Sequence, residues 1–160
     1  YAAAIDQFRL LVERDPKNGE VLMTLGALYL QQEQNEQAAA VFVRLLQIDD
    51  YRSQAHFYLG QVAEVEKRWD EALSHYDQVG KGDQHLDAQI RRAVVLSEQG
   101  KLDEGIRALE RIDTDLPSEI LRLALVRGEI LRDAKRYRDA YDAYTEGLSQ
   151  LPENPDLLYA

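Results

Sequence analysis

The stretch LGQVAEVEKRWDEALSHY, residues 59–76, carries the feature that decides the fold. It places Gly60 and Ala72 twelve residues apart in a segment whose other residues favour helix. A glycine inside a helix costs about 1 kcal/mol relative to alanine, so its presence indicates that another group approaches the backbone closely. The group that we expect there is the second helix of an antiparallel pair.

The same spacing of small residues recurs along the chain. Segments similar to 69–76 begin at residues 1, 35, 102 and 137, so that successive starts lie 34, 34, 33 and 35 residues apart. In each segment the fourth residue is small and the eighth is large and apolar. The small residues are Ala4, Ala38, Ala72, Gly105 and Ala140, and the large ones are Phe8, Phe42, Tyr76, Leu109 and Tyr144.

A second recurring segment lies upstream of the last four of these starts. Its small residue comes twelve positions before the small residue of the helix that follows; these upstream residues are Gly26, Gly60, Ala93 and Gly128. The repeated unit is therefore two helices joined by a tight turn, packed closely where the small residues face each other. We expect a larger residue at these crossings to overpack them by about 1–3 kcal/mol.

This pattern resembles the tetratricopeptide repeat (TPR), whose 34-residue unit is a helix–turn–helix. The match is closest in the first full repeat, which supplies Leu22, Leu25, Gly26, Tyr29, Ala38 and Phe42. Asp50 replaces the closing proline of that family, and Arg92 and Arg127 replace the leucine before the small residue. The resemblance implies an all-α fold, a right-handed superhelical solenoid of antiparallel helix pairs.

We expect residues 1–160 to form one TPR array. The predicted parts are the second helix of a truncated repeat (1–18), full repeats at 19–52 and 53–85, a degenerate repeat at 86–120, a repeat at 121–154 and the start of a further first helix at 155–160. The chain is thus expected to be a fragment of a longer array. Its ends lack the polar face of a capping repeat, so we expect them to favour self-association.

Composition excludes several classes of function. The chain has 160 residues, of which 45% are hydrophobic and 30% charged, and its formal net charge is −10. This acidic balance argues against nucleic acid as the main ligand. The absence of cysteine excludes disulfides, thiolate metal sites and a cysteine nucleophile. No apolar run approaches the roughly 20 residues that span a bilayer, so we expect no membrane insertion by these residues.

Catalytic and metal-binding patterns are not evident. His56 falls at a position that packs between helices, His75 on the expected exposed side of a second helix, and His85 in an irregular loop near a helix start. No two of them have the four-residue spacing of a helical metal site, and no glycine-rich phosphate loop follows a strand. We therefore predict that the chain is not an enzyme and has neither cofactor nor metal.

The resemblance also implies where a partner binds, because a TPR superhelix has a concave groove lined mainly by the first helix of each repeat. Counting by helical period gives the predicted groove residues Met23, Ala27, Leu30, Phe57, Tyr58, Gln61, Ile90, Arg91, Val94, Arg122, Leu125, Glu129 and Arg132. Their apolar members predict a protein or peptide partner with apolar side chains. The alternative is that these apolar residues pack within and between the repeats.

The arginines of the predicted groove suggest a second kind of contact. Arg91, Arg122 and Arg132 would bind carboxylates of a partner, although Glu129 and Asp133 are placed to neutralise them instead. One TPR subclass clamps the C-terminal carboxylate of chaperone tails with Lys and Asn on the first helices. This chain has Met23 and Ala27 there, so we do not expect that activity.

The predicted function is a non-catalytic scaffold or adaptor that binds a protein or peptide segment in the groove. The alternative is a structural module through which a larger protein self-assembles, and an enzymatic role would need a domain outside these residues. The composition resembles long TPR arrays of Gram-negative bacteria, some of which are outer-membrane lipoproteins that act as adaptors for periplasmic enzymes. The compartment, bacterial cytoplasm or periplasm, is left open.

Overall fold

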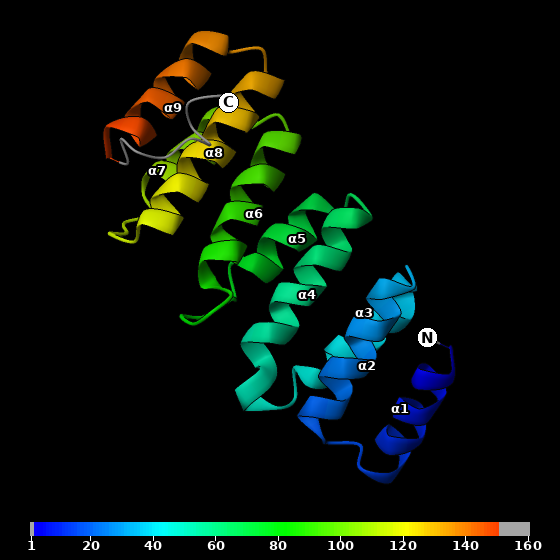
Figure 1. Ribbon diagram of the computed structural model, residues 1–160. Coiled ribbons are helices and arrows are strands. Elements are labelled where there is room, and N and C mark those ends of the chain that lie inside the picture. The colour runs from blue at the N-terminus through cyan, green and yellow to red at the C-terminus, as the bar shows by residue number, and fades with distance from the viewer. Residues whose placement is uncertain (1, 151–160) are drawn as a thin grey trace. The chain divides into compact units, whose positions relative to one another are not determined.

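Helices make up the fold in the computed structural model, which describes residues 2–150 (Figure 1). No strand occurs in that part of the chain. The elements are α1 (Ala2–Arg14), α2 (Gly19–Gln31), α3 (Asn35–Leu45), the 3-10 turn η1 (Asp49–Tyr51), α4 (Arg52–Val65), α5 (Trp69–Tyr76), α6 (His85–Glu98), α7 (Leu102–Glu110), α8 (Pro117–Asp133) and α9 (Tyr137–Gln150). The predicted all-α class is confirmed. The predicted helix at 155–160 lies outside the described residues.

Residues 2–150 divide into two compact units, the first ending at residue 88 and the second beginning at residue 89, within α6. In the first unit each helix from α1 to α5 packs on the helices next to it in sequence. The chain thus alternates between first helices (α2 and α4) and second helices (α1, α3 and α5) of the repeats, and these two sets are called layers below. In the second unit α8 packs on both α7 and α9. Antiparallel helix pairs are thus the building block of each unit.

The helix starts follow the sequence repeat closely. The helices α3, α5, α7 and α9 begin at residues 35, 69, 102 and 137, as the repeat predicts. The repeat boundaries themselves stay a prediction, and the one at residue 121 falls inside α8. That helix begins four residues earlier, at Pro117, because a proline fits the first turn of a helix, where its missing N–H leaves no bond unmade.

Each turn between paired helices contains one residue in the left-handed region of backbone space. The residues are Glu33 (φ 57°), Lys67 (φ 57°), Gly100 (φ 80°) and Lys135 (φ 61°). This conformation ends a helix by directing the chain back, and glycine adopts it without steric cost. Three of the four turns use a longer residue, so the tight turns are built on local hydrogen bonding rather than on glycine alone, as in the bond from Arg68 N to Ala63 O at 2.8 Å.

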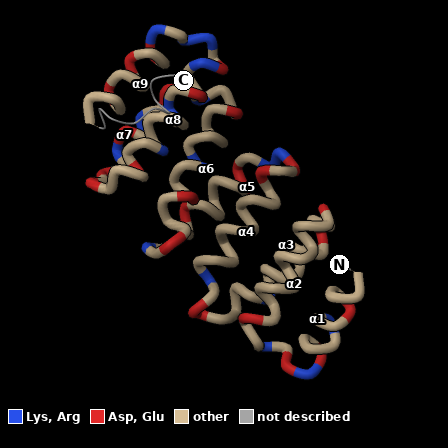
Figure 2. The backbone as a smooth tube through the Cα atoms, viewed as in Figure 1, with Lys and Arg blue, Asp and Glu red and all other residues tan. Residues whose placement is uncertain are grey.

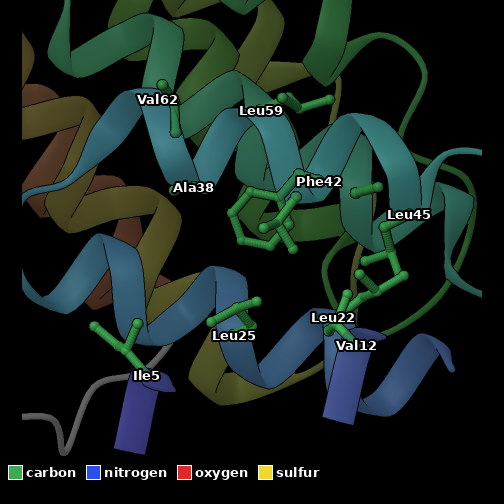
Figure 3. Close-up of a cluster of buried hydrophobic side chains, with 11 residues drawn as sticks. Ile5, Val12, Leu22, Leu25, Ala38, Phe42, Leu45, Leu59 and Val62 are labelled. Atoms are coloured by element: carbon green, nitrogen blue, oxygen red, sulfur yellow. The ribbon is translucent and has the colours of Figure 1, made fainter. Parts of the chain in front are cut away.

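The core of the first unit is centred on Phe42. This side chain is completely buried, as are Leu22 and Leu45. Figure 3 shows side chains from α1, α2, α3 and α4 meeting around it. The ring of Tyr58 stacks on that of Phe42 with centroids 5.0 Å apart and an interplanar angle of 10°. The apolar residues of the repeat pattern therefore join one helix pair to the next.

The glycines of the repeat do face a partner helix, but the group that fills the space is an aromatic ring. A Cβ atom placed on Gly26 would lie 2.5 Å from Cε1 of Phe42, and one on Gly60 would lie 2.5 Å from Cε1 of Tyr76. In the third pair the small residues themselves meet as predicted, because a Cβ on Gly105 would lie 2.6 Å from the carbonyl oxygen of Ala93. Elsewhere glycine makes room for the ring four residues beyond the small partner.

Candidate functional site

In the first unit, the predicted groove residues lie on α2 and α4, and five of them are at least partly exposed. Ala27 is exposed, and the others are half-buried: Met23, Leu30, Tyr58 and Gln61. Met23, Leu30 and Tyr58 also pack against the core, so each presents only part of its apolar surface. The side chains on these two helices are mainly apolar, and the amide of Gln61 and the exposed amide of Gln54 in the first turn of α4 add hydrogen-bonding groups.

Two predicted groove residues are instead part of the packed interior, and the prediction that they line an open groove is wrong. Phe57 is 6% exposed and Ile90 is 5% exposed. The ring of Phe57 meets Tyr58 edge-on at 5.5 Å and lies 6.2 Å from the ring of Tyr76. The alternative stated from the sequence, packing within and between repeats, holds for this residue because an aromatic ring gains more from contact with other rings than from water.

The second unit presents a more charged face. On α8 the predicted groove residues Arg122, Glu129 and Arg132 are exposed and Leu125 is half-buried against the core of that unit. On α6 the predicted residues Arg91 and Val94 are half-buried. Figure 2 shows further Lys and Arg residues grouped at the turn between α8 and α9. This face therefore differs in chemistry from the face of α2 and α4.

His56 and His75 form a pair that the sequence did not predict. The Nδ1 atoms of the two rings lie 3.0 Å apart, and the ring centroids 5.3 Å. Burial lowers the pKa of His56, and the neighbouring His75 and Arg52 lower it further. Burial also lowers the pKa of His75, with Glu71 opposing and Arg68 adding to this effect. The expectation that His75 lies on an exposed surface is therefore wrong.

The histidine pair predicts that stability falls on acidification. A hydrogen bond between two Nδ1 atoms requires one imidazole to remain unprotonated at Nδ1. Because the folded-state pKa of each ring lies below its unfolded value, the unfolded chain takes up protons first. The contribution is complete above the unfolded pKa of about 6.5 and is lost as pH falls through the lower folded values. We expect a loss of about 1 kcal/mol, the net worth of one hydrogen bond.

A double variant separates this effect from other titrations. The first full repeat has Leu22 and Val41 at the positions equivalent to His56 and His75. The double variant His56→Leu with His75→Val therefore introduces residues that the same fold already accommodates in another repeat. Thermal unfolding between pH 7.5 and 5.5 should show a smaller pH dependence in this variant than in the parent. Equal pH dependence in the two proteins would show that the pair is not the titrating element.

Neither a metal-binding cluster nor a membrane-spanning helix occurs in residues 2–150. In that range no three His, Asp or Glu side chains are grouped so as to hold a metal ion. Likewise, none of the described helices combines the length and apolarity that crossing a bilayer requires.

Comparison with known proteins decides the family. The family model for the tetratricopeptide repeat matches residues 1–53 and 24–85, which together are more than half of the chain. The chain belongs to the tetratricopeptide repeat family. A TPR repeat-containing protein of Pseudomonas aeruginosa is 39% identical over 105 residues, which are 66% of this chain and 18% of that protein. The chain thus corresponds to less than a fifth of that relative.

Solved TPR structures share the fold at low sequence identity. MamA has a TM-score of 0.74 at 20% identity, over 94% of this chain and 88% of its own. YrrB, described as a TPR protein with an unusual peptide-binding site, has a TM-score of 0.66 at 17% identity, over 95% and 78% of the two chains. A TPR protein of Parabacteroides merdae has a TM-score of 0.75 at 13% identity, over 98% and 62%. The fold is therefore that of TPR solenoids.

One TPR position carries a charge in place of a core residue. The residue before the glycine of the first helix is Leu25 in one repeat and Leu59 in the next, and both are buried. In the last repeat it is Arg127, whose side chain is only 16% exposed. Its guanidinium pairs with Glu146 of α9 and lies 3.8 Å from Oε1 of Glu110 on α7. An ion pair between three helices thus replaces an apolar contact.

Two hollows flank this ion pair between α7, α8 and α9. Their volumes are about 140 and 290 Å³, and both are lined by Glu110, Arg127 and Glu146. A third hollow, of about 460 Å³, lies between α1, α2 and α3 and has a polar lining that includes Tyr29 and Gln32. None of these three hollows includes a predicted groove residue.

Proposed function

We propose that this TPR chain is a non-catalytic scaffold that binds a protein segment on the face formed by α2 and α4. The observation that supports it most is the combination on this face of exposed Ala27 with the partly accessible apolar side chains of Met23 and Leu30. Aromatic residues and methionine are enriched at protein interfaces, while charged residues are depleted at their centres. An extended or helical peptide with apolar side chains fits such a surface, and Gln54 and Gln61 offer hydrogen bonds to its backbone.

The family and one structural neighbour support the same proposal. TPR solenoids present a continuous surface of first helices, which suits extended partners. YrrB is described as having a peptide-binding site. At 17% identity it shows that this fold can bind a peptide, but it does not identify the ligand of this chain. The match covers only 18% of the P. aeruginosa relative. The proposal therefore concerns a partner of this chain and takes no partner from that longer protein.

A pair of matched double variants tests the proposed face. Ala27→Glu with Gln54→Glu places two negative charges on the face of α2 and α4. Ala40→Glu with Val43→Glu places the same two charges on α3, in the other layer, where both residues are exposed. All four positions are on the surface, so the unfolding temperatures should stay close to that of the parent.

The readout is retention of a partner by the immobilised chain. We expect the first double variant to lose a partner that the parent and the second double variant both retain. Loss in the second variant alone would assign binding to the layer of α1, α3 and α5 and refute the proposed face. Retention by all three proteins would refute it as well.

Self-association is the second candidate, and one surface favours it. Tyr137 and Tyr141 of α9 are 65% and 68% exposed, whereas the equivalent Trp69 and Leu73 of α5 are half-buried. An aromatic face of this kind is suited to packing against another helix. A mass that changes with dilution in the parent, and less so in Tyr137→Ser with Tyr141→Ser, would support self-association; a constant monomer mass would refute it.

A further inference from the structure

Two tyrosines occupy the same place in two different repeats. Tyr76 of α5 lies against Gly60 of α4, and Tyr144 of α9 lies against Gly128 of α8. A Cβ on Gly60 would be 2.5 Å from Cε1 of Tyr76, and one on Gly128 would be 2.0 Å from Cε1 of Tyr144. The two rings therefore pass the first helix of their repeats in the same way.

The two hydroxyls differ in what they bind. The hydroxyl of Tyr76 donates to Oε2 of Glu64 at 2.5 Å, so a carboxylate four residues after Gly60 closes the site. The hydroxyl of Tyr144 is buried and has no hydrogen-bond partner among residues 2–150. The residue four positions after Gly128 is Arg132, which can only donate. A buried donor without an acceptor is uncommon in folded proteins and calls for an explanation.

Burial, more than the nearby charges, keeps the hydroxyl of Tyr144 protonated and therefore a donor. Burial raises the pKa of Tyr144, Arg132 lowers it, and Glu129 and Asp133 raise it, so the group stays protonated at neutral pH. Arg132 has a half-exposed side chain, and its Nε lies 3.7 Å from Oδ1 of Asp133, which is 79% exposed. An ion pair so open to water is weak, so the guanidinium is available to a stronger acceptor.

We propose that Arg132 and Tyr144 together bind a carboxylate of the protein partner, the side chain of an aspartate or glutamate. This carboxylate takes the place that the carboxylate of Glu64 has in the second repeat: one oxygen accepts from the tyrosine hydroxyl and the other pairs with the guanidinium. Binding requires the buried hydroxyl to become accessible, and Arg132 and Glu129, whose charges act on Tyr144, are exposed side chains that are free to rotate. The inference rests on the proposed function, because the carboxylate belongs to a protein partner that the chain is proposed to bind.

The surroundings favour a carboxylate over a phosphate group. Glu129 and Asp133 lie close enough to influence Tyr144, and they repel a doubly charged anion more than a singly charged one. The one internal precedent, Glu64 on Tyr76, is also a carboxylate. The paired donors, a hydroxyl and a guanidinium, match its two oxygens.

Replacement of Arg132 by glutamate tests the site without any ligand. The variant R132E restores the arrangement of Glu64 and Tyr76, so the unfolding temperature should rise by a few degrees, because a buried unpaired donor gains an acceptor. The rise should vanish when R132E is made in a Tyr144→Phe background, which has no hydroxyl to satisfy. Arg138→Glu is the matched control, since Arg138 is an exposed arginine of the same unit and its replacement changes the charge equally.

Binding is tested with two blocked amino acids, N-acetyl-aspartate N-methylamide and its asparagine counterpart. On addition of the aspartate compound, we expect the NMR signals of the Arg132 Nε–H group and the Tyr144 ring to shift, with little change for the asparagine compound. R132E should abolish the shift, Tyr144→Phe should weaken binding on the order of tenfold, and Arg138→Glu should leave it unchanged.

The outcomes separate this inference from the proposed function. Equal shifts with the two compounds, no shift with either, or a shift that survives R132E would overturn the carboxylate site. The proposal that a partner binds on α2 and α4 is tested by variants of the first unit, whereas Arg132 and Tyr144 belong to the second unit. That proposal would therefore stand after such a result. Conversely, the double variants could refute the face of α2 and α4 while the aspartate compound still shifts the signal of Arg132. The carboxylate site would then stand, and its partner would bind elsewhere than on α2 and α4.

Discussion

Replacement of Phe42 by alanine should lower the free energy of unfolding by about 3–5 kcal/mol, the range measured for aromatic residues removed from packed cores. The side chain is completely buried, stacks on Tyr58, and fills the space that Gly26 leaves on α2. Since each repeat contacts mainly its neighbours, the cavity weakens both the α2–α3 pair and its contact with α4. Urea unfolding followed by circular dichroism measures the loss directly.

A double-mutant cycle with Gly26 identifies the ring as the reason for the glycine. Alone, Gly26→Ala should cost about 1–3 kcal/mol through overpacking, since its Cβ would lie 2.5 Å from the ring of Phe42. In the Phe42→Ala background the added methyl group has room, so its cost should fall or reverse. Costs that simply add would show that the glycine is required for another reason.

Replacement of Arg127 by leucine should raise the free energy of unfolding by about 1–2 kcal/mol. Exchanging a buried ion pair for apolar residues is often neutral or stabilising. We expect a gain at the lower end of that range, because Glu110 and Glu146 are about half-exposed and lose little hydration in the ion pair. Leucine is the residue that the first two full repeats have at this position, where Leu25 and Leu59 are buried. The new side chain would also fill part of the hollows beside Arg127.

Comparison with Arg127→Ala separates packing from charge. The alanine variant removes the ion pair and leaves the space empty, so it should be less stable than the parent, whereas the leucine variant should be more stable. The stability of the parent should also depend more on salt than that of the leucine variant, because its ion pairs are partly exposed. A leucine variant less stable than the parent would mean that the ion pair holds the three helices in register better than apolar contact does.

Much of the fold follows from the sequence because the repeat multiplies a weak signal. One glycine in a helix says little, but four small pairs at a common spacing fix where the helices α3, α5, α7 and α9 begin. The partner of the glycine was less predictable. The spacing identifies which residues are small, while the ring of Phe42 or Tyr76 reaches the glycine from a position four residues further along the second helix. Side-chain length and direction decide that contact.

The candidate site was predicted less completely, for a related reason. Helical period places a residue on a face, but a large apolar residue such as Phe57 on that face turns toward other rings and becomes buried. The pairing of His56 with His75 joins positions 19 residues apart on two helices. The unpaired hydroxyl of Tyr144 becomes visible only by comparison with Tyr76, whose acceptor is present. That difference lies in one substitution, Glu64 in one repeat and Arg132 in the other.

Site-specific photocross-linking shows directly whether a protein segment binds on the first helices. A benzophenone amino acid at exposed Ala27 of α2 reports on the proposed face, and the same group at exposed Val43 of α3 reports on the opposite layer. We expect one discrete protein to cross-link to position 27 and not to position 43. Cross-linking of that protein from position 43 and not from position 27 would contradict it.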